Sequence, residues 1–430
     1  MIQYPVKRME SSCHRDDHRS TDRIGRQAVT IFCLMFAISA CSEAQKEDDT
    51  DGALTIGLLL PYTGGDAAIA TNYERAAIIA KDMINDAGGI VNRSVHLISR
   101  DTHSDSVRAE QALEELLSYD PVAIIGPESA EIARTLLPLL QQKEVFFFSP
   151  VISGSESLPT SADTPWFRLA PSSARLGHAF ANHLRVDQNL DSISTVYSND
   201  DYNSDFIRSL ETRFEQLGGN VETSVSLSGE QHSYGPEVND LLAAGTHNVV
   251  LAASVDSASR FVNELSVSSG GESLHWFLSP GLQTPVFLQN TLQSALEGAV
   301  GIGLKVENLD LYFIDEYQTR WEDKPLDGAF FYFDAVTVLS LAMATASFNN
   351  GGALTYDAVK HAVFDIASPS GVQVRWSDQF QAFTHIAKGR PLYYSGLTGA
   401  LLLTDDGQQK KALMTTWSVI DGQIVVTDAL

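Results

Sequence analysis

The sequence predicts an α/β protein made of two doubly wound, parallel-sheet lobes. Short apolar runs of strand length alternate with segments in which apolar residues recur every three or four positions. The runs are apolar almost throughout, which is typical of parallel strands that helices cover on both faces. The alternation forms two separate series, so we expect two lobes of similar architecture, although no residue-level repeat relates them.

The first series opens with a strand from Leu54 to Leu60, which Pro61-Tyr62-Thr63-Gly64-Gly65 ends. A helix follows from Tyr73, and Gly88-Gly89 supplies its stop. The other elements expected in this series are helices over 106–117 and 129–140 and strands over 95–99, 122–125 and 145–148. The second series predicts strands over 194–197, 221–226, 249–252 and 276–278 and helices over 206–217, 236–244 and 257–268.

The N-terminal part has the order of an export signal. Arg23 and Arg26 precede an apolar core from Ala28 to Ala37, and Ile38-Ser39-Ala40 lead to Cys41 in the pattern of a bacterial lipobox. We therefore expect removal of residues 1–40, a lipid anchor on Cys41 in the periplasm and a polar tether over 41–52. The alternative is an ordinary secreted protein with a chance cysteine at the cleavage point. Ser42 leaves open whether the inner or the outer membrane holds the anchor.

Composition limits the partners of the chain. The formal charge of −25 argues against nucleic acid and anionic lipid, so contact with the membrane is expected through the anchor only. Cys13 and Cys33 lie in the segment to be removed, which leaves no pair for a disulfide. No second apolar stretch is expected to approach membrane-spanning length.

Ligands of open parallel sheets bind beyond the carboxyl ends of the strands, where loops and helix N-termini meet. The loops at those ends are rich in Ser, Gly and backbone groups, which suits a small zwitterion or amide. They comprise residues 61–66, 126–130, 149–155, 199–202, 254–257 and 279–283.

Several segments in collinear order carry a family resemblance. They are Ile56-Gly57-Leu58-Leu59-Leu60-Pro61-Tyr62-Thr63-Gly64, Ile84-Asn85-Asp86-Ala87-Gly88-Gly89-Ile90, Ile125-Gly126-Pro127, Phe148-Ser149-Pro150, Phe167-Arg168-Leu169-Ala170-Pro171, Phe333-Asp334-Ala335-Val336, Tyr394-Ser395-Gly396-Leu397-Thr398-Gly399 and Thr404-Asp405-Asp406-Gly407. Over nearly the whole mature chain, the sequence resembles type I periplasmic solute-binding proteins, in the Leu/Ile/Val- and amide-binding branch of ABC importers.

The resemblance implies a hinge that the chain crosses three times. One lobe would hold residues 53–170 and 304–395, and the other 171–303 and 396–430. It further implies a small-molecule ligand between the lobes, ABC permease subunits as partners, no cofactor and no catalytic activity.

The resemblance also implies ligand-binding residues. Ser129 or Ala130, depending on a one-residue alignment choice, would bind the ligand carboxylate, while Val151 would offer its carbonyl and Ser153 its hydroxyl. Tyr202 would close over the ligand from the other lobe. For the two serines the alternative is plain helix capping, and for Tyr202 it is an ordinary loop aromatic.

One departure from the family pattern concerns the ligand ammonium. The loop around Gly281, Ser279-Pro280-Gly281-Leu282, lacks the acidic residue that amino-acid binders commonly place there. Either Asp256 or Asp201 serves instead, or the ligand is not an ordinary α-amino acid, because a buried ammonium needs a partner.

A second departure is the long segment 368–391. In it, Phe380, Phe383 and Ile386 at helical spacing predict core packing.

Two other functions compete with import. An enzyme is not expected, because no nucleophile elbow, phosphate-binding loop or His-Glu-x-x-His pair is present, and His96 and His103 around Asp101 are interpreted as a surface group. The other is an envelope lipoprotein with the same fold that acts as a sensor or as a regulator, for example of cell-wall synthesis.

Overall fold

The computed structural model describes residues 52–64, 67–152, 167–229, 231–245, 247–268, 274–304, 311–410 and 414–429. The predicted signal peptide, the lipobox with Cys41 and nearly all of the predicted tether lie outside these residues, as does Ser153.

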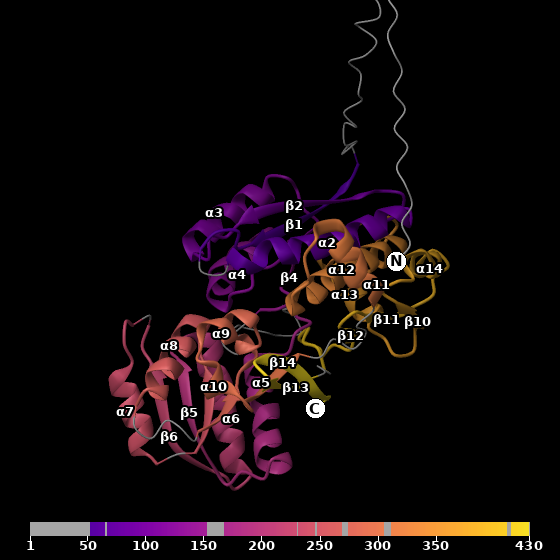
Figure 1. The fold of residues 1–430 in the computed structure, drawn as a ribbon. Helices are drawn as coiled ribbons and strands as arrows, with labels where there is room; N and C mark the ends of the chain where they lie inside the picture. Colours follow the sequence, from indigo (N-terminus) through magenta and orange to yellow (C-terminus); the bar gives the residue numbers. More distant parts are fainter. Residues whose placement is uncertain are drawn as a thin grey trace, which may run out of the picture. The chain divides into compact units, whose positions relative to one another are not determined.

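The first sheet has four parallel strands in the order β2-β1-β3-β4 (Figure 1). Its elements follow the predicted alternation. The helix predicted over 106–117 is confirmed at both ends, and the Asp105 side chain caps its first turn. The elements are β1 (Leu54–Leu60), α2 (Ala67–Asp86), β2 (Val95–Asp101), α3 (Ser106–Leu117), β3 (Ala123–Ile125), α4 (Ala130–Lys143) and β4 (Phe146–Phe148).

The second sheet has seven strands in the order β14-β13-β9-β8-β7-β5-β6. Its strands are β5 (Ser192–Ser198), β6 (Asn220–Leu227), β7 (Asn248–Ala252), β8 (His275–Leu278), β9 (Val300–Leu304), β13 (Met414–Ile420) and β14 (Gln423–Ala429). Its helices are α5 (Ser173–Asn182), α6 (Asp201–Gln216), α7 (Gly235–Ala243), α8 (Val255–Ser266), α9 (Pro285–Asn290) and α10 (Gln293–Leu296), with a π turn over His183–Asp187 and a 3-10 turn over Pro280–Leu282.

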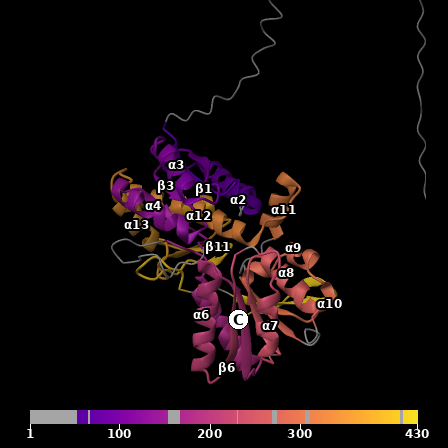
Figure 2. The ribbon, with the colours of Figure 1, turned by 90° about the vertical axis from the view of Figure 1, so that its left-hand side faces the viewer.

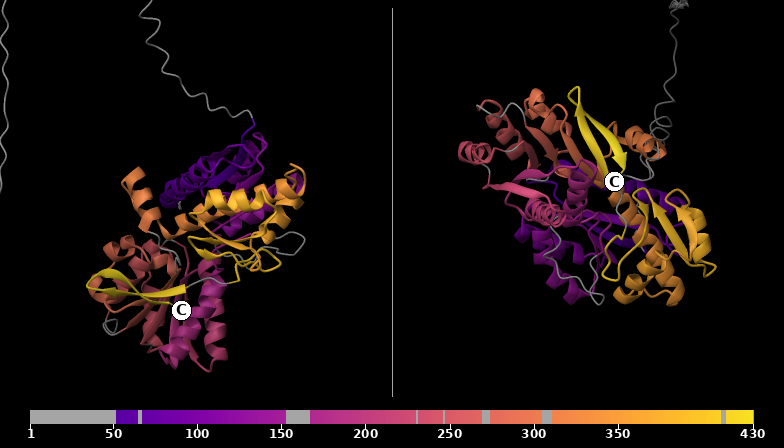
Figure 3. Two further views of the ribbon diagram at one scale, coloured as in Figure 1. Left: turned by 90° about the vertical axis from the view of Figure 1, so that its right-hand side faces the viewer. Right: turned by 90° about the horizontal axis from the view of Figure 1, so that it is seen from below.

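The edge of this second sheet departs from the prediction. Five strands are parallel, but β13 runs antiparallel to β9 and pairs with β14 in a hairpin, seen in yellow in Figure 3. The turn is Asp421-Gly422, and both residues have left-handed φ angles, 52° and 69°. An Asp-Gly pair between β-rich runs is a strong hairpin signal, so the sequence contained this element although the prediction omitted it.

Both sheets are covered on two faces, as the doubly wound prediction requires. One face of the first sheet packs against α3 and α4, and the other against α2 and α12. In the second sheet α5 and α6 cover one face and α7 and α8 the other, and Figure 2 shows α6 and α7 on opposite sides of β6. The α/β fold with parallel-sheet lobes is therefore confirmed.

The first lobe is completed by a later part of the chain. This part comprises α11 (Leu311–Trp321), α12 (Asp327–Asn349), α13 (Tyr356–Asp365), α14 (Gln379–Ile386) and a small sheet of β10 (Val372–Arg375), β11 (Leu392–Gly396) and β12 (Gly399–Ala400). The chain thus passes between the two large cores three times, after β4, after β9 and before β13. Leu397, Leu401 and Leu403 also pack in the first core.

Helix α12 corrects the expectation about membrane-spanning length. Among the described residues it is the one helix that is long and apolar enough to cross a bilayer, but 94% of its apolar window is buried inside the protein. It is the central helix of the first core, where it packs beside α2 (Figure 1).

Asp334 links two of the resemblance segments, the one over 333–336 and the one over 394–399. Its buried carboxylate accepts hydrogen bonds from the Tyr394 hydroxyl at 2.8 Å and from the backbone N–H groups of Leu397 at 2.9 Å and Thr398 at 2.8 Å. A Cβ at Gly396 would lie 2.3 Å from the same carboxylate, so only glycine fits there. These segments hold the end of β11 on α12.

Candidate functional site

The loops after β3 and β4 are tied together at the carboxyl edge of the first sheet. Gly126 has a φ angle of +99°, and a Cβ there would lie 2.2 Å from the carbonyl oxygen of Leu59, so glycine is required. Ser149, at the end of β4, donates its hydroxyl to the carbonyl of Pro127 at 2.5 Å. The short loop between β3 and α4 is therefore held in one conformation.

Glu128 is the acidic residue of this loop. The hydroxyl of Tyr332, on α12, donates a short hydrogen bond to its Oε1 atom. Burial, and then the nearby negative charge of Glu128, raise the pKa of Tyr332 well above its ordinary value, so the phenol stays protonated as the donor. Tyr73 stacks on Tyr332 with ring centroids 4.9 Å apart, which fixes the position of the hydroxyl.

Ser129 and Ala130 begin α4. The Ser129 hydroxyl accepts from the backbone N–H of Ile132 at 3.5 Å, so it caps the helix through a long hydrogen bond, and its side chain is half-buried. The methyl group of Ala130 is buried in the core between α3 and α4. Of these two predicted ligand residues, Ser129 can offer a side chain, and Ala130 only a backbone N–H.

Val151 follows β4 and is half-buried against the first core. Ser153, predicted to bind the ligand through its hydroxyl, lies outside the described residues.

Tyr202 lies in the first turn of α6, beyond the carboxyl end of β5. The Asp200 carboxylate caps this helix by accepting from the N–H of Asn203 at 2.9 Å. Burial, and then the charge of Asp200, raise the pKa of the Tyr202 hydroxyl. Its neighbour Asp201 pairs with Arg134 of α4, with 2.6 Å between Oδ2 and Nη2. This ion pair brings together the first part of α4 and the start of α6, which belong to different sheets.

The remaining predicted residues lie at the ends of β7 and β8. Asp256 is exposed in the first turn of α8, and Gly281 is exposed in the turn after β8, with no atom near where a Cβ would stand. Directly after β8, the buried hydroxyl of Ser279 has no hydrogen-bond partner among the described residues. The structure does not show either Asp256 or Gly281 in contact with Ser129 or Tyr202.

The prediction missed Glu128, Tyr332 and Arg134. Glu128 stands directly before the predicted Ser129, so an acidic residue in the strand-end loop was a signal that the sequence offered. The contact with Tyr332 spans 204 residues of chain, and no local pattern indicates it. Arg134 lies one turn inside α4. A charged residue there is what any solvent-facing helix position would show, so the sequence offered no sign of its ion pair.

Among the described residues, the remaining polar clusters do not meet the requirements of a metal site. No group of three or more His, Cys, Asp or Glu suited to a metal occurs in the part of the chain that the structure describes. His103 lies 3.2 Å from Asp101, but His96 is placed opposite Thr55 near the other end of β2. Residues 101 and 103 hold the ends of β1 and β2 together through Thr63.

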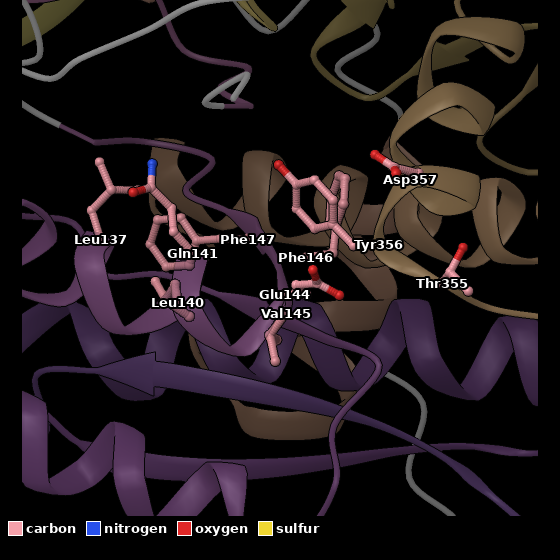
Figure 4. A pocket seen from close by; sticks show the side chains of 10 residues that line it. All are labelled: Leu137, Leu140, Gln141, Glu144, Val145, Phe146, Phe147, Thr355, Tyr356 and Asp357. Atoms are coloured by element: carbon pink, nitrogen blue, oxygen red, sulfur yellow. The ribbon is translucent and has the colours of Figure 1, made fainter. Parts of the chain in front are cut away.

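A cavity of about 300 Å³ lies at the opposite, amino edge of the first sheet. Figure 4 shows Leu137, Leu140 and Gln141 of α4 on one side and Tyr356 of α13, next to Phe146, on the other. Because it lies at the start of β4, it is separate from the strand-end loops.

Comparison with known proteins decides the family. A family model described as periplasmic binding protein matches residues 53–378. The chain belongs to the periplasmic binding protein family. This family is one of solute-binding proteins related to the substrate-binding components of ABC transporters, and membership implies an extracytoplasmic location.

This periplasmic binding protein is similar to a curated relative and to solved structures. It is 26% identical over 361 residues to the chemotactic signal transduction system substrate-binding protein BasB of Halobacterium salinarum, which covers 82% of this chain and 83% of the relative. Its fold is similar to that of the branched-chain amino acid transporter substrate-binding protein LivJ from Streptococcus pneumoniae in complex with isoleucine, with a TM-score of 0.70, 16% identity and coverage of 88% of this chain and 99% of that one.

A further similar structure is an ABC transporter solute-binding protein from R. palustris in complex with benzoate. Its TM-score is 0.66 at 15% identity, with coverage of 88% of this chain and 96% of that one. These likenesses establish the type I periplasmic binding fold for both lobes.

Proposed function

We propose that this protein captures a small polar solute between its two lobes and delivers it to an ABC importer as an extracytoplasmic lipoprotein anchored through Cys41. The observation that carries the proposal is the ion pair between Arg134 and Asp201. It joins the helices that begin directly after the strand-end loops of the two sheets, which supports a ligand site shared by Ser129 and Tyr202.

The residues around the start of α4 favour a zwitterion or an amide. The free N–H groups at the helix N-terminus, with Ser129 as cap, favour a carboxylate or a carbonyl oxygen. Glu128, beside them, favours an ammonium or an N–H donor, and its Oε1 atom accepts a hydrogen bond from the Tyr332 hydroxyl. This arrangement supplies an acid that the loop around Gly281 lacks, so an amino-acid-like ligand fits the site better than the sequence suggested.

Capture would follow from closure of the lobes. A ligand that contacts Ser129 on one lobe and Tyr202 on the other gains both sets of contacts only in the closed state. It therefore shifts the open and closed populations by its difference in affinity for the two.

The proposal is tested by thermal-shift measurements with amino acids, primary amides and benzoate. A ligand at a hundred times its dissociation constant stabilises the protein by about 2.7 kcal/mol. We expect shifts from zwitterions or amides, a reduced shift in Glu128→Gln, and an unchanged shift in Glu131→Gln, an exposed acid in the first turn of α4. A shift from benzoate alone, equal in all three proteins, would contradict the proposed ligand chemistry.

A sensory or regulatory role is the second candidate, and the chemotactic relative is the observation that favours it. The two roles differ in what the loss of the protein does to cells. Loss of uptake of the radiolabelled ligand supports import. Intact uptake with loss of a response to that ligand, behavioural or in cell-wall synthesis, supports sensing or regulation.

A further inference from the structure

The first lobe exposes an apolar groove far from the strand-end loops. A hollow of about 650 Å³ lies between the C-terminal ends of α2, α12 and α14. Three large apolar side chains on it face solvent, since Phe380 is 71% exposed, Val91 58% and Phe348 50%. Exposed apolar residues gathered in one place are a sign of an interaction surface.

Phe380 does not have the core role that its spacing predicted. Ile386, on the same helix, is buried in the first core, and Phe383 is partly buried against it. Phe380 lies in the first turn of α14 and points out of that core into solvent. The prediction of core packing is correct for two of the three residues and wrong for Phe380.

Val91 shows that the exposed apolar side chain is held at a conformational cost. Ile90 and Arg93 exchange two backbone hydrogen bonds, of 2.8 and 3.0 Å, around a two-residue turn. Val91 and Asn92 both have left-handed φ angles, 51° and 61°. Glycine and asparagine suit such a turn, whereas a β-branched residue is strained there. The groove thus carries an exposed valine at a position whose backbone conformation disfavours it.

The rim of the groove is basic, against the acidic character of the whole chain. Arg93, Lys388 and Arg390 are exposed on the two turns that border it, and Asp86 is the one acidic residue of these turns. The turn containing the latter two basic residues touches the groove, since a Cβ at Gly389 would lie 3.2 Å from the Phe348 ring.

The chain enters the lobe at this same place. The carbonyl of Gly52, the first described residue, accepts a 2.5 Å hydrogen bond from Nε of Arg93, and β1 begins two residues later. Ten residues lie between Cys41 and Gly52, and the eleven Cα-to-Cα steps from one to the other span roughly 40 Å when extended. The groove is therefore within reach of any membrane to which Cys41 is attached.

We propose that the groove with its basic rim rests on the phospholipid bilayer beside the tether. Phe380, Phe348 and Val91 would enter the boundary between headgroups and acyl chains, and Arg93, Lys388 and Arg390 would reach the lipid phosphates. The net charge of −25 repels an anionic bilayer over most of the surface, so the contact is local and depends on the tether for its effective concentration.

The contact would orient the protein. The groove lies where α2 ends and β1 begins, at the amino edge of the first sheet. The candidate ligand loops leave the opposite, carboxyl edge. With the groove on the bilayer, these loops point away from the membrane and stay open to solute.

Tryptophan quenching in the full chain tests the proposal. Phe380→Trp and Val107→Trp place the probe at exposed positions on opposite edges of the same lobe, because Val107 is 65% exposed just after β2. Each is mixed with vesicles of phosphatidylcholine and phosphatidylglycerol that carry brominated acyl chains. We expect about a twofold loss of the added emission at position 380 and none at 107, since quenching requires burial at acyl depth.

A charge variant separates this contact from insertion of the N-terminal apolar run. Lys388→Glu with Arg390→Glu, in the Phe380→Trp background, should abolish the quenching while the protein still sediments with the vesicles. Equal quenching at positions 380 and 107, or none at 380 although the chain is bound, would overturn the proposal, as would quenching that the charge variant leaves intact.

Discussion

Arg134 of α4 and Asp201 of α6 form an ion pair, with 2.6 Å between Nη2 and Oδ2, although they belong to helices of different sheets. Their side chains are 35% and 51% exposed, so the pair contributes little to folding stability. Its position matters more than its energy, because it bridges the region between Ser129 and Tyr202.

The pair should favour the closed arrangement of the lobes. We expect Arg134→Ala to weaken ligand binding two- to fivefold, which corresponds to the roughly 0.5–1 kcal/mol of an exposed pair. Calorimetric titration measures the affinity. The exchanged pair Arg134→Asp with Asp201→Arg should restore it, and the difference should shrink at high salt. Unchanged affinity in the single variant would mean that the pair does not take part in closure.

Ser129→Ala separates helix capping from ligand binding. The hydrogen bond to Ile132 is long, at 3.5 Å, so its loss should cost only about 0.5–1 kcal/mol of unfolding free energy. The capping cost lowers the melting temperature of the protein without ligand. If the hydroxyl also binds ligand, the further rise in melting temperature that the ligand produces should be smaller in the variant. A full ligand shift in the variant would show that Ser129 is a cap alone.

Asp334→Asn should destabilise the protein without touching the ligand. The carboxylate accepts from Tyr394, Leu397 and Thr398, and an amide nitrogen in its place would face donors instead of accepting from them. We expect a loss of about 3 kcal/mol in urea denaturation. The exposed Asp365→Asn serves as the control and should change stability by less than about 0.5 kcal/mol.

Asp101 should make stability depend on pH in the acid range. Burial alone would raise its pKa, but hydrogen bonds from the His103 backbone and from Thr63 outweigh burial and hold the pKa below its ordinary value. The carboxylate therefore stabilises the fold fully above pH 4, roughly the pKa of an unfolded Asp, and this stability is lost as pH falls through the lower folded pKa. Asp101→Asn should cost about 1–2 kcal/mol at pH 7 and should flatten the fall in unfolding free energy below pH 4. Denaturation at pH 7, 4 and 3 measures both effects, and parallel curves for the two proteins would contradict the assignment.

Cys41→Ser tests the proposed anchor. The lipidated protein should fractionate with membranes and incorporate radioactive palmitate, and the variant should do neither. Cys33→Ser, within the predicted export signal, is the matched control and should be labelled normally. Labelling of the Cys41 variant would exclude that residue as the lipid attachment site.

The start of α2 illustrates where prediction along the sequence fails. The apolar spacing predicted a helix from Tyr73, whereas α2 begins at Ala67. The additional turns contain Asn72, whose buried amide donates to the carbonyl of Lys324 at 2.9 Å and accepts from the N–H of Leu326 at 2.8 Å. These partners lie about 250 residues away, so no window of sequence around Asn72 indicates that the helix extends through it.

The sequence by itself determined the alternation of strands and helices and the covering of both sheet faces, because apolar periodicity and turn residues are local properties. The family followed from the resemblance segments and from the matching family model. Only the tertiary structure decided which distant side chains contact one another. It showed the hydrogen bond from Tyr332 to Glu128, the ion pair of Arg134 with Asp201 and the exposure of Phe380 to solvent. It also showed that the segments containing Asp334 and Gly396 are hydrogen-bonded to each other. Such contacts depend on side chains brought together from distant parts of the chain, and their geometry has no counterpart in residue spacing.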